Sequence, residues 1–152
     1  MLYSKEYRLG VGIMIVNSKN EVFLGNRSNS YNNYTMPQGG ILQYEVPYKA
    51  MCRELQEEVG IKMIQHCSFI ARSRYWYTYN FPSNFKYMLK YKGQMQQWFL
   101  IRFHGNDSDI NLNKNIPQEF YSYLWTSDII GLVSKVKRSL YSSIYNEFST
   151  YL

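Results

Sequence analysis

The chain has 152 residues, 45% of them hydrophobic, and this length predicts one compact domain over residues 1–152 without a separate regulatory module. Its 17 lysines and arginines outnumber 11 acidic residues, and the net charge of +6 favours an anionic partner because a basic surface attracts phosphates. The longest apolar run near the start, residues 11–16, is far shorter than the roughly 18 residues that cross a bilayer, and no charged leader precedes it, so neither membrane insertion nor secretion is expected.

The two cysteines indicate the compartment. Cys52 and Cys67 are neither a C-x-x-C pair nor an even framework of disulfides. Two buried thiols in a reducing compartment are expected, which predicts a cytoplasmic location.

The first half of the chain predicts a β-hairpin, a loop and a helix, in that order. Residues 11–16 are apolar and rich in β-branched side chains, a turn follows at 17–20, and residues 21–26 complete the hairpin. Residues 28–35 are crowded with Ser, Asn and Tyr and predict a loop. Apolar residues mostly three or four apart predict an amphipathic helix over about 46–59, ended by Gly60. Its apolar positions are Val46, Ala50, Met51, Leu55 and Val59.

The second half predicts three strands and a final helix. The strands are expected at residues 68–79, 97–104 and 120–125, because aromatic and branched side chains gather there. From about Ser134, apolar residues four apart predict a helix packed on the core. These residues are Val136, Leu140, Ile144 and Phe148. Strands interspersed with two helices indicate a mixed α/β sandwich.

Four of the eleven acidic residues lie between positions 45 and 58, at Glu45, Glu54, Glu57 and Glu58. At 100° per residue, the last three share an arc of roughly 100° on one helical face. Like charges one turn apart destabilise a helix, and a hard divalent cation such as Mg²⁺, which prefers oxygen ligands, would offset that repulsion. Arg53 lies four residues before Glu57 and can brace its carboxylate. A solvated acidic face without metal is the alternative.

These acids belong to a longer pattern over residues 39–61. With U for an aliphatic residue it is G-x5-E-x7-R-E-U-x-E-E-x-G-U, and every fixed position is filled. The pattern resembles the Nudix box, which implies a loop–helix–loop in a single-domain α/β/α sandwich with a mixed sheet. The resemblance also implies hydrolysis of nucleoside diphosphates linked to another moiety. Glu54, Glu57 and Glu58 would then be metal ligands, with Glu57 also a candidate base and with Glu45 and Arg53 as supports.

Segments outside the box resemble the bacterial RNA pyrophosphohydrolase branch of this family, also described as dinucleoside polyphosphate hydrolases. They are Tyr7-Arg8 with Val11-Gly12, Met36-Pro37-Gln38-Gly39-Gly40, Gln94-Met95-Gln96-Gln97-Trp98-Phe99-Leu100 and Pro117-Gln118-Glu119-Phe120. By this resemblance Glu119 joins the metal site or acts as the base, and Arg8 contacts the substrate's phosphates. A solvated acid and a surface arginine are the alternatives. Gln38, Gly39 and Gly40 are expected at the substrate, since glycines let backbone approach closely.

Three basic residues open the predicted last helix: Lys135, Lys137 and Arg138. They could steer a phosphate chain, with Lys137 as the substrate-binding candidate, although a solvated basic face is favoured over that role. His66 and His104 have no metal-ligand spacing and are expected to be structural or surface residues.

A row of aromatic residues alternates with other side chains from position 75 to 81, with the period of two that a strand gives. Its members are Tyr75, Tyr77, Tyr79 and Phe81. Sheet packing explains most of this alternation, and base stacking is the alternative.

The resemblance implies a Mg²⁺-dependent enzyme, with Mn²⁺ as a possible substitute, that converts 5′-triphosphate RNA ends to 5′-monophosphates and so initiates mRNA decay. Dinucleoside polyphosphates such as diadenosine tetraphosphate or pentaphosphate are the alternative substrate. A Nudix-fold protein that only binds RNA or nucleotides is an alternative of another class. No DNA or membrane partner is expected, and the oligomeric state stays open.

Overall fold

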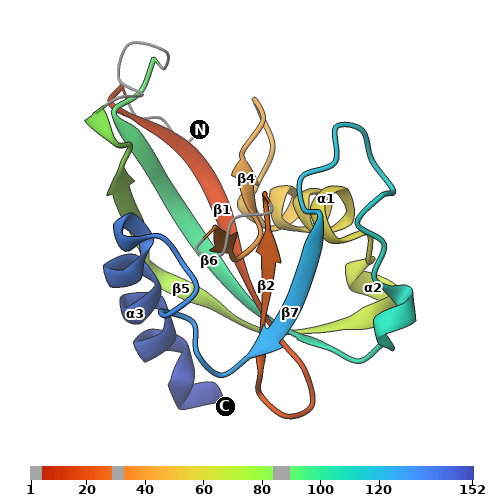
Figure 1. Ribbon diagram of the computed structural model, residues 1–152. Helices are drawn as coiled ribbons and strands as arrows, with labels where there is room; N and C mark the ends of the chain where they lie inside the picture. Colours follow the sequence, from red (N-terminus) through yellow and green to blue (C-terminus); the bar gives the residue numbers. More distant parts are fainter. Residues whose placement is uncertain (1–4, 29–32, 84–89) are drawn as a thin grey trace.

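The computed structural model describes residues 5–28, 33–83 and 90–152 (Figure 1). Its strands are β1 (Tyr7–Val16), β2 (Val22–Asn26), β3 (Tyr34–Thr35), β4 (Gln38–Gly40), β5 (Cys67–Asn80), β6 (Gly93–Phe103) and β7 (Ser122–Thr126). Its α-helices are α1 (Pro47–Val59), α2 (Met63–His66) and α3 (Lys135–Phe148), and short 3₁₀ turns lie at Asp107–Asp109 and Ser149–Tyr151. None of the helices in these ranges is long and apolar enough to span a membrane.

A mixed sheet forms the centre of the molecule, with the strand order β3-β2-β1-β6-β5. β1 runs parallel to β6 along its whole length, from Tyr7 opposite Gly93 to Val16 opposite Arg102, and β5 is antiparallel to β6. The other edge of β1 is shared between two partners. Its residues 10–12 pair with β4, and its last residue, Val16, pairs with Val22 of β2.

Two helices cover opposite faces of this sheet, as Figure 1 shows for α1 and α3. Because successive side chains of a strand point to opposite faces, β1 and β6 supply both cores. Ile13 and Phe99 belong to the core beneath α1, together with Leu55. Met14 and Leu100 belong to the core beneath α3. The predicted α/β/α sandwich with a mixed sheet is confirmed.

Helix α1 begins and ends where the sequence indicates. Pro47 occupies the first turn, where its missing N–H costs no hydrogen bond. Gly60 ends the helix in the left-handed conformation, at φ 77°, and its N–H donates to the carbonyl of Gln56 at 3.1 Å. Four of the five predicted apolar positions are buried, namely Ala50, Met51, Leu55 and Val59. The prediction for the fifth, Val46, is wrong, because it precedes the first turn of the helix and is 57% exposed.

Three expectations about the elements and one about the cysteines need correction. The predicted hairpin is confined to its turn, because β1 pairs with β2 only at its last residue, Val16, while its residues 10–12 pair with β4. Within the predicted loop over 28–35, residues 29–32 lie outside the described residues, and Tyr34–Thr35 form a strand paired with β2. The strand predicted over residues 97–104 begins four residues earlier, at Gly93. The short helix α2 has no signal in the sequence. Both cysteines are free but half-buried, where buried thiols were predicted.

Candidate active site

Two glutamates of α1 face β4 from beneath. Glu54 and Glu58 are four residues apart and therefore lie on one side of the helix, where both are buried. One carboxylate oxygen of Glu58 accepts the backbone N–H of Gln38 at 3.0 Å. The Glu54 carboxylate lies so close to Gly39 that a Cβ there would be 1.9 Å from its carboxyl carbon. Only glycine at position 39 leaves room for this carboxylate. Glu57, at the outer side of the same turn, is exposed.

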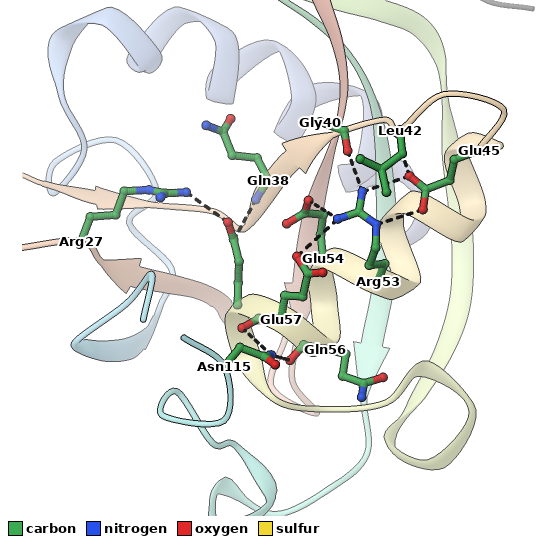
Figure 2. A network of polar contacts seen from close by, with 11 residues as sticks. Arg27, Gln38, Gly40, Leu42, Glu45, Arg53, Glu54, Gln56, Glu57 and Asn115 are labelled. Atoms are coloured by element: carbon green, nitrogen blue, oxygen red, sulfur yellow. Dashed lines mark hydrogen bonds and ion pairs between the residues drawn. The ribbon is translucent and has the colours of Figure 1, made fainter. Parts of the chain in front are cut away.

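Arg53 joins the acids of the box to the loop before it (Figure 2). Its guanidinium donates two hydrogen bonds of 2.9 Å to the Glu45 carboxylate and one of 2.7 Å to the carbonyl of Gly40. It also donates to Glu54 at 2.7 Å and to Glu57 at 3.3 Å. The predicted brace to Glu57 is thus the longest of five contacts. The hydrogen bonds from Arg53 lower the pKa of Glu45, which therefore stays ionised.

Arg27, which directly follows β2, connects the box helix to Glu119. Its guanidinium donates to Glu58 at 3.2 Å and to Glu119 at 2.7 Å, and it lies 5.1 Å from the centre of the Phe120 ring. Sequence reasoning missed Arg27, because it belongs to no pattern. The available signal was its position at the end of a predicted strand in a chain whose acids need a cationic partner.

Burial raises the pKa of both inward-facing glutamates. The pKa of Glu58 rises to about 8, chiefly by desolvation and further by the Glu54 carboxylate, while Arg27 opposes the rise. The pKa of Glu54 is also raised by burial, with Glu57 and Glu119 adding to the rise and Arg53 opposing it. Burial therefore favours the neutral form of both carboxyl groups, and the two arginines offset this only in part.

The donor set fits a hard divalent cation, because three glutamates of one helix and Glu119 offer oxygen ligands in a crowded, partly buried site. As placed in the described ranges, no three acidic, histidine or cysteine side chains already converge as a metal cluster. The reason is visible in the contacts, since Arg53 and Arg27 occupy the space between the carboxylates. A cation would replace these ion pairs.

A second group of polar side chains lies on the α3 side of β4. The Gln38 side chain accepts a hydrogen bond of 2.7 Å from Gln96 and donates one of 3.4 Å to the Tyr79 hydroxyl. Lys137 of α3 places its ammonium 5.6 Å from the centre of the Tyr79 ring. The guanidinium of Arg8 covers Gly40, where a Cβ would be 2.3 Å from its Nη2. The predicted substrate residues are thus brought to one end of the sheet.

The expected solvated basic face holds for exposed Lys135 but not for Lys137, whose side chain is half-buried. The buried residues of α3 are Leu140, Tyr141, Ile144 and Phe148. At 100° per residue, Lys137 lies within about 5° of the middle of this buried face, whereas Val136 lies about 95° away. Val136 is accordingly 46% exposed, so its place in the predicted core is also wrong. Desolvation, with Arg27 nearby, lowers the pKa of Lys137 to about 8.

Other expectations concern residues away from this cluster. The Nδ1 of His66 accepts the backbone N–H of Lys62, and the Nε2 of His104 lies 2.6 Å from the Ser68 hydroxyl, so both histidines have local surface roles. In the aromatic row, Tyr77 and Tyr79 pack against the core beneath α3 and Tyr75 is exposed. Sheet packing explains the two inward members.

Comparison with known proteins places this arrangement in a family. The NUDIX domain model matches residues 6–128. The RNA pyrophosphohydrolase of Orientia tsutsugamushi (strain Boryong) is 42% identical over 152 residues, covering 96% of this chain and 92% of that protein. The RNA pyrophosphohydrolase of Rickettsia prowazekii (strain Madrid E) is 41% identical over 150 residues, covering 95% and 91%.

Solved structures agree on the fold. A binary complex of a C. elegans Ap4A hydrolase superposes with a TM-score of 0.67 at 19% identity, covering 93% of this chain and 96% of that one. A MutT protein from Methanosarcina mazei Go1 gives a TM-score of 0.62 at 23% identity, covering 96% and 98%. The chain belongs to the Nudix family, whose members generally use divalent cations. Within that family it is a hydrolase that acts on pyrophosphate bonds.

Proposed function

We propose that this protein is an RNA pyrophosphohydrolase that converts 5′-triphosphate RNA ends to 5′-monophosphates and thereby initiates mRNA decay. The supporting observation is that Arg27 forms ion pairs with two acids at once. Its guanidinium lies 2.7 Å from Glu119, an acid outside the box, and 3.2 Å from Glu58 of the box helix. The relatives from Orientia and Rickettsia, which share this chain's length nearly in full, are named for the same activity.

The chemistry follows from the two sides of the site. A divalent cation held by Glu54, Glu57, Glu58 and Glu119, Mg²⁺ or Mn²⁺ in its place, would supply charge neutralisation at the phosphate oxygens and a polarised water. Glutamate acts as the general base, with exposed Glu57 as the first candidate and Glu119 as the second. The proton of the water passes to this carboxylate as the water oxygen bonds to phosphorus. The phosphoanhydride bond opposite breaks, and pyrophosphate leaves.

The cationic side of the site binds the phosphate chain. Arg8 and Lys137 reach it from β1 and α3, and Gln38, Gly39 and Gly40 line it from β4. Arginine and lysine donate charge-assisted hydrogen bonds to phosphate oxygens, which fixes the RNA end relative to the carboxylates. Residues 1–152 act as one domain in this proposal, and the free thiols of Cys52 and Cys67 suit action in the cytoplasm.

The test compares two substrates under the same conditions. Purified protein with Mg²⁺, and in a parallel series with Mn²⁺, is incubated with 5′-triphosphate RNA and with diadenosine tetraphosphate, and kcat/KM is measured for each. The RNA should be the better substrate. Rapid turnover of the dinucleotide with inert RNA would make the protein a dinucleoside polyphosphate hydrolase instead.

A variant pair separates catalysis from binding. Glu57→Gln should abolish product formation while RNA binding, measured by filter retention, stays within about twofold. Gln56→Ala changes the exposed neighbour of Glu57 and should leave both unchanged. Absence of turnover in the wild type with either substrate and either metal, with RNA binding intact, would point to a binding protein.

A further inference from the structure

The loop before β7 crosses the C-terminal end of α1. Both amide hydrogens of Asn115 are directed at this end, since its Nδ2 donates to the carbonyls of Gln56 and Glu57, each at 3.1 Å (Figure 2). The backbone N–H of Asn111 donates to the carbonyl of Val59 at 3.0 Å. Two residues of one loop therefore bind three carbonyls of the last helical turn.

This contact satisfies groups that the helix cannot satisfy itself. The last four carbonyls of an α-helix have no partner within the helix. Gln56 receives the N–H of Gly60 and also Asn115, whereas Glu57 receives Asn115. The loop also approaches very closely, because a Cβ on Gly60 would lie 2.1 Å from the carbonyl oxygen of Asn111. The loop is thus held in one register against α1.

The same loop continues to Glu119, four residues after Asn115. The side chain of Glu119 is 41% exposed, so packing alone does not fix its carboxylate. The buried ring of Phe120 anchors the chain on the far side of Glu119, and Asn115 anchors it on the near side. The backbone that carries Glu119 to Arg27 is therefore attached to the box helix directly, through the carbonyls of Gln56 and Glu57.

We propose that Asn115 is a positioning residue, which holds Glu119 beside the box glutamates by donating both amide hydrogens to the carbonyls of Gln56 and Glu57. This inference rests on the proposed function, because it assigns Glu119 a part in the reaction. Asn115 itself contacts backbone, so it acts on the reaction only through the place of Glu119. Groups that hydrogen-bond directly to metal ligands commonly change activity or metal affinity by about 10–100-fold when removed, and because Asn115 acts through the backbone we expect the lower end of that range.

The first experiment replaces Asn115 by its isostere. Asn115→Asp keeps the shape of the side chain but turns two donors into acceptors that face carbonyl oxygens. With 5′-triphosphate RNA and saturating Mg²⁺, kcat should fall by roughly 10-fold or more while KM stays within about twofold. Asn113→Asp is the matched control, since it adds the same charge two residues away, and the side chain of Asn113 makes no hydrogen bond to any described residue. Its kcat should be unchanged.

A double-mutant cycle with Glu119→Gln tests the route of the effect. If Asn115 acts through Glu119, then adding Asn115→Asp to Glu119→Gln should lower kcat by less than twofold. An undiminished effect in that background would overturn the inference, as would an unchanged kcat in Asn115→Asp alone. A full kcat in Glu119→Gln would instead remove Glu119 from the proposed reaction, so failure of the inference and failure of the function are distinguishable.

A measurement without substrate completes the test. Mn²⁺ binding to the protein, followed by electron paramagnetic resonance, should weaken in Asn115→Asp and Glu119→Gln by the same factor, and in the double variant by no more. Additive losses would contradict the inference. Should Asn115→Asp fail to fold, Asn115→Ala enters the same cycle, because it removes the donors without placing a charge against the carbonyls.

Discussion

Burial and ion pairing shift the pKa of the Glu58 carboxyl group in opposite directions. Its pKa in the folded protein is about 8, against 4.5 ordinarily, because desolvation outweighs the attraction of Arg27. Between pH 4.5 and pH 8 the folded state therefore keeps a proton that the unfolded state has lost. The stability that this group contributes is complete below pH 4.5 and is lost as pH rises through 8.

A glutamine at position 58 removes this titration. Without metal, the free energy of unfolding of Glu58→Gln relative to wild type should rise by roughly 2–4 kcal/mol between pH 5 and pH 9. Urea denaturation in the presence of a chelator measures it. Glu6→Gln, at an acid whose side chain is 67% exposed, is the control and should show no trend. A flat difference for Glu58→Gln would mean that Glu58 ionises normally in the fold.

The pKa of Lys137 is shifted downwards, opposite to that of Glu58, because desolvation disfavours the charged form of a cation. Because its pKa is about 8, the ammonium is present at pH 7 and mostly lost at pH 9. If Lys137 binds substrate phosphate, KM for 5′-triphosphate RNA should rise several-fold over this range at saturating metal. In Lys137→Arg the cation persists at both pH values, so the rise should disappear. The same rise in Lys137→Arg would assign the pH dependence to another group.

Among the elements, the end of α1 requires glycine at position 60. Gly60 combines a φ of 77° with an approach to Asn111 that leaves no room for a Cβ. Gly60→Ala should therefore lower the free energy of unfolding by about 2 kcal/mol or more, since strain and overlap add. Thermal and urea unfolding measure this loss. Lys49→Ala, at an exposed position near the start of α1, should stay within about 0.5 kcal/mol.

Elements with a strong local pattern could be predicted from sequence, and those defined by distant partners could not. α1 has apolar spacing, a proline at its start and a glycine at its end, so its bounds were predicted within one residue. β4 has only three residues and exists because β1 lies beside it. In α3, a spacing of four drifts by 40° at each step, so the apolar series leaves the buried face at Val136.

The residues of the site also divide into those that a local sequence pattern predicts and those that only distant contacts define. The box acids and Arg53 occupy one local segment, and their spacing on a helix is fixed by geometry. Arg27 and Asn115 act across 31 and 58 or more positions, on Glu58 and on the backbone at Glu57, where no periodicity relates the partners. Such contacts arise only when the sheet and the loop before β7 bring distant segments together.

At the scale of the whole molecule, charge is segregated. The site holds five of the eleven acids and four of the 17 basic residues, which leaves six acids against 13 basic residues elsewhere. The five are Glu45, Glu54, Glu57, Glu58 and Glu119. An acidic centre in a basic surround suits a long anion whose end alone meets the carboxylates, because the rest of the chain then contacts cations.

This distribution predicts a salt dependence that differs between substrates. For 5′-triphosphate RNA of ten or more nucleotides, kcat/KM should fall by roughly 10-fold between 50 and 200 mM KCl, as released counterions are recaptured. Diadenosine tetraphosphate has fewer phosphates and should show a smaller fall. Equal falls for the two substrates would mean that the RNA body makes no contact with the basic surface.

The change of partner along β1 has a consequence for how this enzyme could diversify. Where β1 passes from β4 to β2, the carboxylates of Glu54 and Glu58 approach from the α1 layer and Lys137 approaches from the α3 layer. The two layers have separate cores, so residues of one can be exchanged without repacking the other. A substrate with a different nucleobase or leaving group could therefore be accommodated by changes in α3 and β5 alone. The carboxylates on the α1 side would stay unchanged.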